Sequence, residues 1–396
     1  MSETAPTRKI IIKDGLDNQD YLCITLIMGL MGAFFWAIRG TGGFGGTDGG
    51  ALAGLGWAML WVGFSQYGGY AKQRPYGHGA MAAAIICGIT FGGMTGYGVY
   101  TAWVRGEFYL DYPQGMRPVG VWTGYLALFL CGIHWGGVTG AFMAWCAPAK
   151  AIGPLGWVLR ILSGIAGAWL TLIFVRANPQ LFLPFYSEGL YEIEENKTCI
   201  RALGSIQNIA PHVGLYLGFL AFEIARRDWR AVKVMAIMAL GFAIPFAIGG
   251  AWHNGHSMSL QIDWWKNWEM TIGLGGGLSF GLVFFLFNQP TNPVVRPTTK
   301  IERILGLGFL MCATTWIVIR SAHEGFIKTH ELTQLYDTRA GVAVFCILGA
   351  LFMFVLWTVL SMRENQKLLQ HPEYPVLPPK LVITILAIIV LAGYIT

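Results

Sequence analysis

The sequence predicts an all-α fold, a polytopic bundle of transmembrane helices with internal repeats and glycine-rich helix interfaces. Of its 396 residues, 55% are hydrophobic and only 12% are charged, which is more apolar surface than a soluble fold of this length can bury. Long apolar runs are spread along the chain, and the segment Cys87–Gly96, CGITFGGMTG, returns as CGIHWGGVTG at Cys131–Gly140. Self-similarity of this kind marks duplicated packing units.

About eleven apolar runs are long enough to cross roughly 30 Å of hydrocarbon as a helix. They must be helical, because an unpaired backbone amide in lipid costs several kcal/mol, and they are too long and continuous for the strands of a barrel. In chain order the expected spans are approximately Tyr21–Ile38, Gly50–Tyr67, Gly79–Val104, Val119–Cys146, Leu155–Val175, His212–Ile224, Val232–Gly250, Met270–Phe287, Ile304–Ile319, Gly341–Leu360 and Leu381–Thr396.

Positive charges predict the orientation of these spans. Lys and Arg concentrate in alternate gaps, starting with the tail 1–20, whereas the connection 176–211 carries glutamates at 188, 192, 194 and 195. The positive-inside rule then makes the N-terminus cytoplasmic and the C-terminus extracytoplasmic, in what we expect to be a bacterial inner (plasma) membrane. The whole chain, 1–396, is a single membrane domain with a cytoplasmic tail 1–20, a first helix group 21–175, an extracytoplasmic loop 176–211 and a second helix group 212–396.

Glycines line one edge of both repeated segments. Because an edge without side chains lets two helices approach closely in lipid, helix packing is the plainer interpretation; the alternative is that these faces slide or line a narrow pathway. The two neighbouring repeated helices must run antiparallel, while weaker matches of 34–40 with 245–250 and of 49–56 with 273–281 suggest a larger duplication with parallel copies. The glycines are Gly92, Gly93 and Gly96 in the first segment and Gly136, Gly137 and Gly140 in the second.

The first candidate site is the glycine-rich stretch 40–50, which follows Arg39 and contains Asp48. Its backbone amides are free to approach an anion. It does not match the GxxxxGK[ST] phosphate loop, so nucleotide binding is a poor interpretation. A structural alternative is a tight turn that an Arg39–Asp48 ion pair closes, since irregular backbone at membrane depth must be buried or face a cavity.

A second polar segment follows residue 250, where His253, His256 and Asp263 precede Trp264 and Trp265. The spacing fits no closed zinc pattern, so we expect no metal. Together with Trp252 and Trp268, the tryptophans form either an interfacial belt or a surface on which a sugar ring can stack. Seven cysteines without a CxxC pair indicate neither a disulfide framework nor a thiolate metal site.

Arg176 and Arg320 each end a span on the same predicted face, where snorkelling to the interface is the simpler explanation. His134 is the candidate for proton coupling, because it lies at the centre of a span; a neutral histidine bonded between helices is the alternative. We expect one outer polar vestibule. Its predicted substrate-binding residues are Arg39, Asp48, Arg176, His253, His256, Asp263, Trp264, Trp265 and Arg320.

The expected function is secondary transport of a small polar or anionic solute, such as a sugar or sugar acid. Many spans, duplication and a polar cluster occur without an ATP-binding motif. The alternatives are a membrane-embedded enzyme that uses His253, His256 and Asp263 on a lipid-linked or periplasmic substrate, and a structural subunit of a membrane complex. We expect no cofactor; the partners are the lipid bilayer and the solute, with a homo-oligomer or complex subunit left open. Orientation accounts for the net charge of +6, so no nucleic acid is needed.

Overall fold

The computed structural model describes residues 16–41, 45–65, 79–150, 152–258, 260–288, 313 and 316–317. Six of the described helices are long and apolar enough to cross a membrane. The prediction of a helical membrane bundle is therefore confirmed, but the count of about eleven spans is not; apart from residues 313, 316 and 317, the three spans predicted beyond residue 303 lie outside the described residues. The elements are α1 Asn18–Thr41, α2 Gly46–Ser65, α3 Gly79–Gly92, α4 Tyr100–Val104, β1 Glu107–Leu110, β2 Gly115–Pro118, α5 Val121–Cys146, α6 Pro154–Ala177, η2 Pro179–Leu181, η3 Tyr186–Glu188, α7 Lys197–Ala225, α8 Trp229–Gly249, η4 Gly250–Ser257 and α9 Trp264–Asn288.

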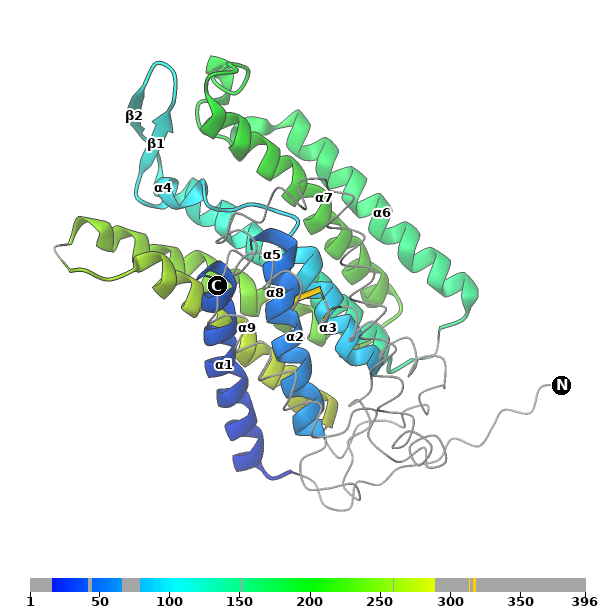
Figure 1. The fold of residues 1–396 in the computed structure, drawn as a ribbon. Helices are drawn as coiled ribbons and strands as arrows, with labels where there is room; N and C mark the ends of the chain where they lie inside the picture. The colour runs from blue at the N-terminus through cyan, green and yellow to red at the C-terminus, as the bar shows by residue number, and fades with distance from the viewer. Residues whose placement is uncertain are drawn as a thin grey trace, which may run out of the picture.

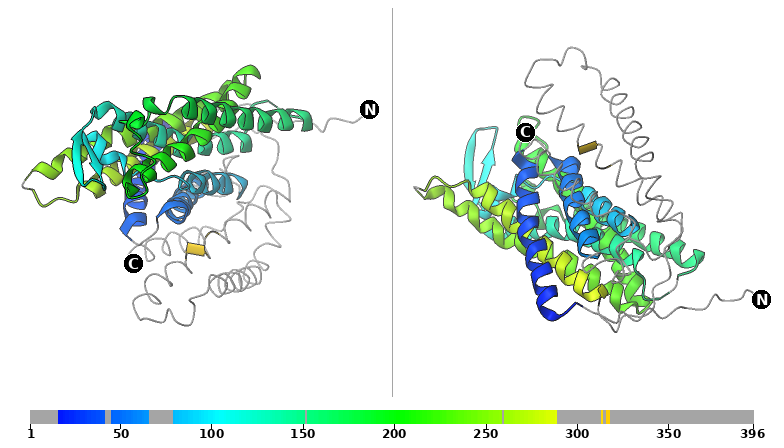
Figure 2. Two further views of the ribbon diagram at one scale, coloured as in Figure 1. Left: turned by 90° about the horizontal axis from the view of Figure 1, so that it is seen from above. Right: turned by 60° about the horizontal axis from the view of Figure 1, so that its bottom comes forward.

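The long helices pack mainly in pairs, α1 with α9, α5 with α8 and α6 with α7 (Figure 1). Between the first two pairs lies an aromatic core, in which the Trp36 ring is 5.6 Å from Phe242 and 6.0 Å from Trp57. The helix α6 lies along the outer edge of the bundle beside α7, and most of its side chains are exposed and apolar (Figures 1 and 2). In a membrane protein such a face meets lipid.

Glycines stand where two backbones meet. On α5, a Cβ at Gly132 would lie 2.6 Å from Ala243 N, and one at Gly140 would lie 2.9 Å from Met235 Cα, both on α8. On α9, a Cβ at Gly277 would lie 2.6 Å from the Met28 carbonyl carbon of α1. On both helices the glycines recur every four residues, so they lie along one edge of the helix. An edge without side chains allows close van der Waals packing of the two helices.

The two similar segments lie against each other but do not fold alike. Gly88 faces Thr139 and Gly92 faces Trp135, so α3 and α5 run antiparallel. The first segment stops being helical at Gly92, whereas the second continues to Cys146. The single span predicted over 79–104 is therefore wrong: residues 93–99 form a break, because Gly93 backs directly onto the Gly46 backbone at the start of α2 and glycine is a poor helix former. The described structure does not support the predicted repeat units.

The predicted loop 176–211 is also corrected, since α7 begins at Lys197 and only 178–196 lies between helices. The segment 197–211 contains polar residues and Pro211, so it does not form an apolar run and its helix is not predicted from hydropathy. The turn of the β1–β2 hairpin stabilises the start of α7, because Asp111 accepts a hydrogen bond from the Thr198 backbone N–H at 2.7 Å. Arg117 of β2 also forms two hydrogen bonds with Glu188, at 2.5 and 2.9 Å, which fasten the hairpin to η3.

Candidate functional site

Arg39, on the last turn of α1, is the centre of a buried polar cluster. Only 3% of the residue is exposed. Its guanidinium donates from Nη2 to the Tyr97 hydroxyl, pairs with Glu269 of α9 at 3.6 Å, and lies 4.2 Å above the Trp36 ring. Arg39 Nε and the indole N–H groups of Trp36 and Trp135 are buried without an acceptor among the described residues. Buried donors of this kind usually have a partner, so the cluster is suited to receiving acceptor oxygens.

Two cations share one carboxylate in this cluster. Lys266 Nζ is 2.6 Å from Glu269 Oε2 and also donates to Ala37 O at 3.1 Å, and it comes from the first turn of α9. Arg39 and Lys266 against Glu269 leave one positive charge. Because a buried charge is costly unless it is paired, this site favours a singly charged anion.

Aromatic rings wall the cluster. Tyr97, in the break after α3, lies 5.3 Å from Trp268 and 6.5 Å from Trp265 between ring centroids, the latter nearly parallel. His253 of η4 is 1% exposed and lies 4.9 Å from the Trp268 ring. Its Nε2 has no partner in the described part of the chain. Flat rings with scattered polar atoms suit a solute that has both an apolar face and hydroxyl groups.

An open polar pocket of about 490 Å³ adjoins the cluster. The His256 ring lines this pocket and is nearly parallel to the His253 ring, with centroids 5.7 Å apart. Only the His256 side chain therefore separates the pocket from the buried His253. An Arg105–Glu107 ion pair of 2.6 Å also lines the pocket, and the hydrogen bond from Arg105 lowers the pKa of Glu107. The pocket is lined by Arg105, Glu107, Tyr109, Asn254, His256 and Ser257.

The structure brings five of the predicted site residues together: Arg39, His253, His256, Trp264 and Trp265. Trp264 stacks on Trp252, with centroids 6.0 Å apart. Trp264 and Trp268 are both buried, at 7% and 0% exposure, so these two do not belong to a lipid-facing belt.

The other predicted residues lie apart from the cluster. The expected Arg39–Asp48 pair is wrong: Arg39 pairs with Glu269, and Asp48 accepts a bond from Trp316 Nε1 at 2.9 Å in the first turn of α2. Asp263 accepts from the Lys266 backbone N–H at 3.0 Å and thereby caps α9. Arg176 is exposed at the end of α6, which packs mainly on α7. Arg320 lies outside the described residues.

Tyr97, Lys266 and Glu269 escaped the sequence prediction. Lys266 and Glu269 are three residues apart, a spacing that places them on one helix face, but the expected span began only at Met270. The helix in fact starts at Trp264. Nothing in the sequence around Tyr97 distinguishes it from other aromatic residues, because the break at Gly93 positions it.

His134 is completely buried on α5, and its Nε2 lies 3.0 Å from Gly92 O. Its ring is stacked on that of His212 of α7, which the sequence prediction did not single out. Within the described residues, no group of three His, Cys, Asp or Glu side chains comes together as a metal site requires.

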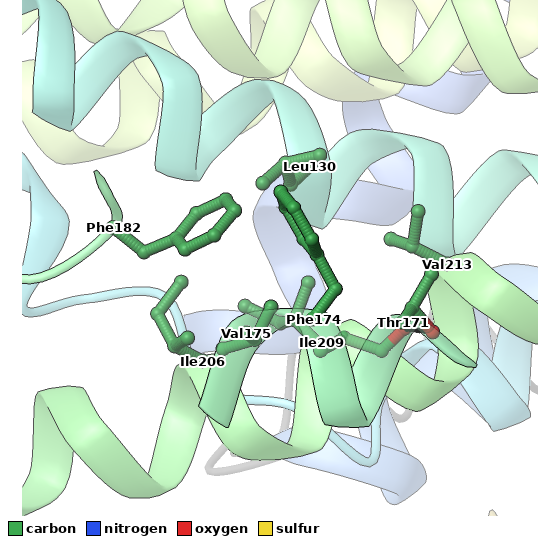
Figure 3. Close-up of a pocket in the computed structure, with 9 residues that line it drawn as sticks. Leu130, Thr171, Phe174, Val175, Phe182, Ile206, Ile209 and Val213 are labelled. Carbon is green, nitrogen blue, oxygen red and sulfur yellow. Dashed lines mark hydrogen bonds between the residues drawn. The ribbon is translucent and has the colours of Figure 1, made fainter. Parts of the chain in front are cut away.

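A second pocket, of about 130 Å³, is of a different kind (Figure 3). Side chains of α5, α6 and α7 together with Phe182 point into it, and all are apolar except Thr171. The Thr171 hydroxyl already donates to backbone carbonyls, among them Ala210 O at 2.8 Å. This pocket suits hydrocarbon and offers no group for chemistry.

No protein family model, curated protein or solved structure matches this chain.

Proposed function

We propose that the protein is a secondary transporter of a small anionic or polar solute, of the sugar-acid kind. The observation that carries the proposal is the buried Arg39, with a donor still free at Nε, beside Lys266 and a single Glu269. One uncompensated positive charge matches one carboxylate of the solute. The rings of Trp36, Trp265 and Trp268 supply stacking surfaces for its carbon skeleton.

The helix breaks support transport. Alpha-helical transporters bind solutes near interrupted helices, where free backbone groups and side chains meet at one site. Here α1 ends, α2 begins and α3 breaks around the Arg39 cluster, since Gly93 contacts the Gly46 backbone and Tyr97 contacts Arg39. The polar pocket at His256 gives this cluster an approach from the side that the charge pattern predicts to be extracytoplasmic.

At the opposite end of the bundle, buried charges join α6 to α7. Arg160 of α6 pairs with Glu223 of α7 at 2.6 Å, and Arg226 approaches the same carboxylate at 2.9 Å. Arg160 and Glu223 are 1% and 0% exposed at their side chains. An open polar pocket at one end and helices joined by buried ion pairs at the other support an outward-facing state of an alternating-access transporter.

A membrane-embedded enzyme is the second candidate, because His256 and Glu107 line one open pocket and can exchange protons there. Ser257 does not favour it, since its hydroxyl donates to Asn254 O at 2.9 Å. A His256→Ala variant separates the two functions. An enzyme would lose turnover with binding unchanged, whereas a transporter built around Arg39 would retain most of its uptake.

The test compares Arg39→Gln with Arg176→Gln, an exposed arginine at the same end of the bundle. Binding of gluconate and of glucose is measured by calorimetry, and gluconate uptake is measured in proteoliposomes. We expect Arg39→Gln to weaken gluconate binding about 10- to 100-fold, as loss of a charge-assisted hydrogen bond should, and to stop uptake. Arg176→Gln should behave as wild type. Background uptake of a panel of sugar acids and sugars by folded wild type would overturn the proposal.

A further inference from the structure

Two histidines from different helices are stacked inside the membrane-spanning bundle. The rings of His134 on α5 and His212 on α7 are 4.4 Å apart between centroids and inclined by 16°. Both helices are long and apolar enough to span a membrane. Phe91 of α3 covers the pair, with its ring 4.7 Å from that of His212 and 5.8 Å from that of His134. Ionisable groups at such depth are costly to keep and mark proton or substrate paths.

Hydrogen bonding fixes which nitrogen of His134 is free. A carbonyl oxygen only accepts, so the 3.0 Å contact with Gly92 O requires that Nε2 carries the hydrogen. In the neutral ring, Nδ1 then holds a lone pair. That Nδ1 is buried without a partner in the described structure, and so is Nδ1 of His212. His134 Nδ1 is therefore a basic nitrogen without a partner, and it belongs to a ring that is stacked on the half-buried His212.

No charged side chain of the described helices compensates a cation there. Neither histidine forms an ion pair with an acidic side chain of the described residues, and α3, α4 and α5 contain no Asp, Glu, Lys or Arg. The titratable neighbours along the packed helices are Cys87, Cys131 and Tyr216, and the Tyr216 hydroxyl donates to Met235 O. The charged residues of α7 itself are Lys197, Arg201 and Glu223. The elements that pack on α5 and α7 add Arg160, Arg176, Arg230, Lys233 and Glu107, all toward element ends.

The pair is connected to the Arg39 cluster by direct contacts. Trp135 follows His134 on α5, and its ring lies 5.6 Å from the Arg39 guanidinium carbon. Gly92, which accepts the bond from His134, also packs against Trp135. On the other side, Pro211 precedes His212 inside α7, where the missing backbone N–H lets the helix bend. A charge change at the rings can therefore act on both the solute site and the seam between α5 and α7.

We propose that His134 and His212 form a single-proton site that makes the transporter a proton symporter. A proton binds at Nδ1 of one ring, while Nε2 of His134 keeps its bond with Gly92 O. A second proton is excluded, because two cations at this separation repel strongly in a medium of low dielectric. An anion that neutralises Arg39 makes a positive charge on the neighbouring pair less costly, so solute and proton bind together. The symport step rests on the proposed function; the proton site does not.

The proton site is tested without solute, by ¹⁵N NMR of the histidine rings in the full chain in lipid nanodiscs. Signals are assigned with His134→Gln and His212→Gln, and the exposed His256→Gln serves as the control. In the wild type we expect both rings to follow one shared titration, with the second proton bound at least about 100-fold more weakly than the first. Two independent protonations, or no change at either ring between about pH 4 and pH 9, would overturn the proposal.

Symport is tested in proteoliposomes with gluconate. An inward proton gradient should accelerate uptake by the wild type and by the control Arg176→Gln, whose arginine is exposed and lies apart from the histidines. His212→Gln should lose this acceleration but still carry gluconate down its own concentration gradient. Full proton dependence in His212→Gln would refute the coupling. If the wild type takes up no gluconate at all, the transport proposal fails while the NMR titration still decides the proton site.

Discussion

At the scale of single residues, the charges around Arg39 decide what the site can hold. Glu269 is as deeply buried as Arg39 and has Lys266 as a second partner. A buried ion pair gains little net stability, but removing one partner leaves a costly unpaired charge. Glu269 therefore limits the net positive charge around Arg39, and in the proposed transporter it would limit the affinity for an anionic solute.

Replacing Glu269 with Gln should separate stability from affinity. We expect Glu269→Gln to lower the free energy of unfolding by about 3–5 kcal/mol, because Arg39 and Lys266 then repel each other without a carboxylate. Gluconate should bind more tightly to this variant, since the net charge of the site rises. Denaturant unfolding and calorimetry measure the two effects. The control is Glu107→Gln, whose pair with Arg105 is partly exposed and should contribute at most about 1 kcal/mol.

The exposed pair of Arg117 and Glu188 should make the hairpin contact depend on pH. Hydrogen bonds from Arg117 lower the pKa of Glu188. A lowered pKa in the folded state means that the pair contributes fully above the unfolded pKa, about 4.3, and is lost as the pH falls through the folded value. Spin labels on Cys substituted for Gln114 and Glu192 should report one narrow distance at neutral pH and a broad one below about pH 4. In Glu188→Gln the distribution should be broad at every pH; a narrow one would contradict the assignment.

The sequence indicates part of this site because charge is conspicuous in apolar surroundings. Arg39 and His253 are polar residues at the ends of long apolar runs, and both prove to be buried in the cluster. Asp48 and Asp263 are equally conspicuous, but they lie at the N-terminal ends of α2 and α9. Composition cannot distinguish an acidic residue at a helix N-terminus from one that binds a solute. Tyr97 depends on a helix break that only tertiary contact creates.

At the scale of elements, close helix contacts depend on particular glycines. Gly136 of α5 faces the Met238 backbone of α8, where a Cβ would lie 2.7 Å from the Met238 carbonyl carbon, whereas nothing lies within 4 Å of a Cβ at Gly204 on α7. We expect Gly136→Ala to destabilise the protein by about 1–3 kcal/mol, because α5 and α8 must separate. Gly204→Ala should stabilise it by roughly 0.5–1 kcal/mol through the lower entropy of the unfolded chain. Unfolding of both variants in mixed micelles checks the signs; equal effects would show that the α5–α8 contact is looser than the structure indicates.

Apolar length predicts most of these elements, and its failures have physical causes. Helices α1, α5, α6, α8 and α9 lie where hydrophobic runs predict them. Apolar length does not predict the start of α7, because its first turn carries polar residues, one of which, Thr198, bonds to Asp111 of the hairpin turn. The run over 79–104 is as apolar as a continuous span, yet its helix ends where Gly93 contacts the Gly46 backbone. Hydropathy averaged over a window of sequence contains no information about such a contact with a distant segment.

At the scale of the whole molecule, the described helices have two distinct ends. One end carries the hairpin, η2, η3, η4 and the polar pocket, and the other carries the Arg160–Glu223 cluster and the connection between α5 and α6 (Figure 1). Basic residues such as Lys150, Arg226 and Arg230 gather at the second end, and glutamates at the first. The positive-inside rule therefore predicts that the second end is cytoplasmic.

Cysteine labelling tests that orientation. Glu192, between α6 and α7, and Ala149, between α5 and α6, are both exposed and lie at opposite ends. In intact cells a membrane-impermeant maleimide should label Glu192→Cys above the wild-type background, and Ala149→Cys only after permeabilisation. The reverse pattern would place the polar pocket in the cytoplasm. Solute and proton would then enter the Arg39 cluster from inside the cell, so the same geometry would describe an exporter.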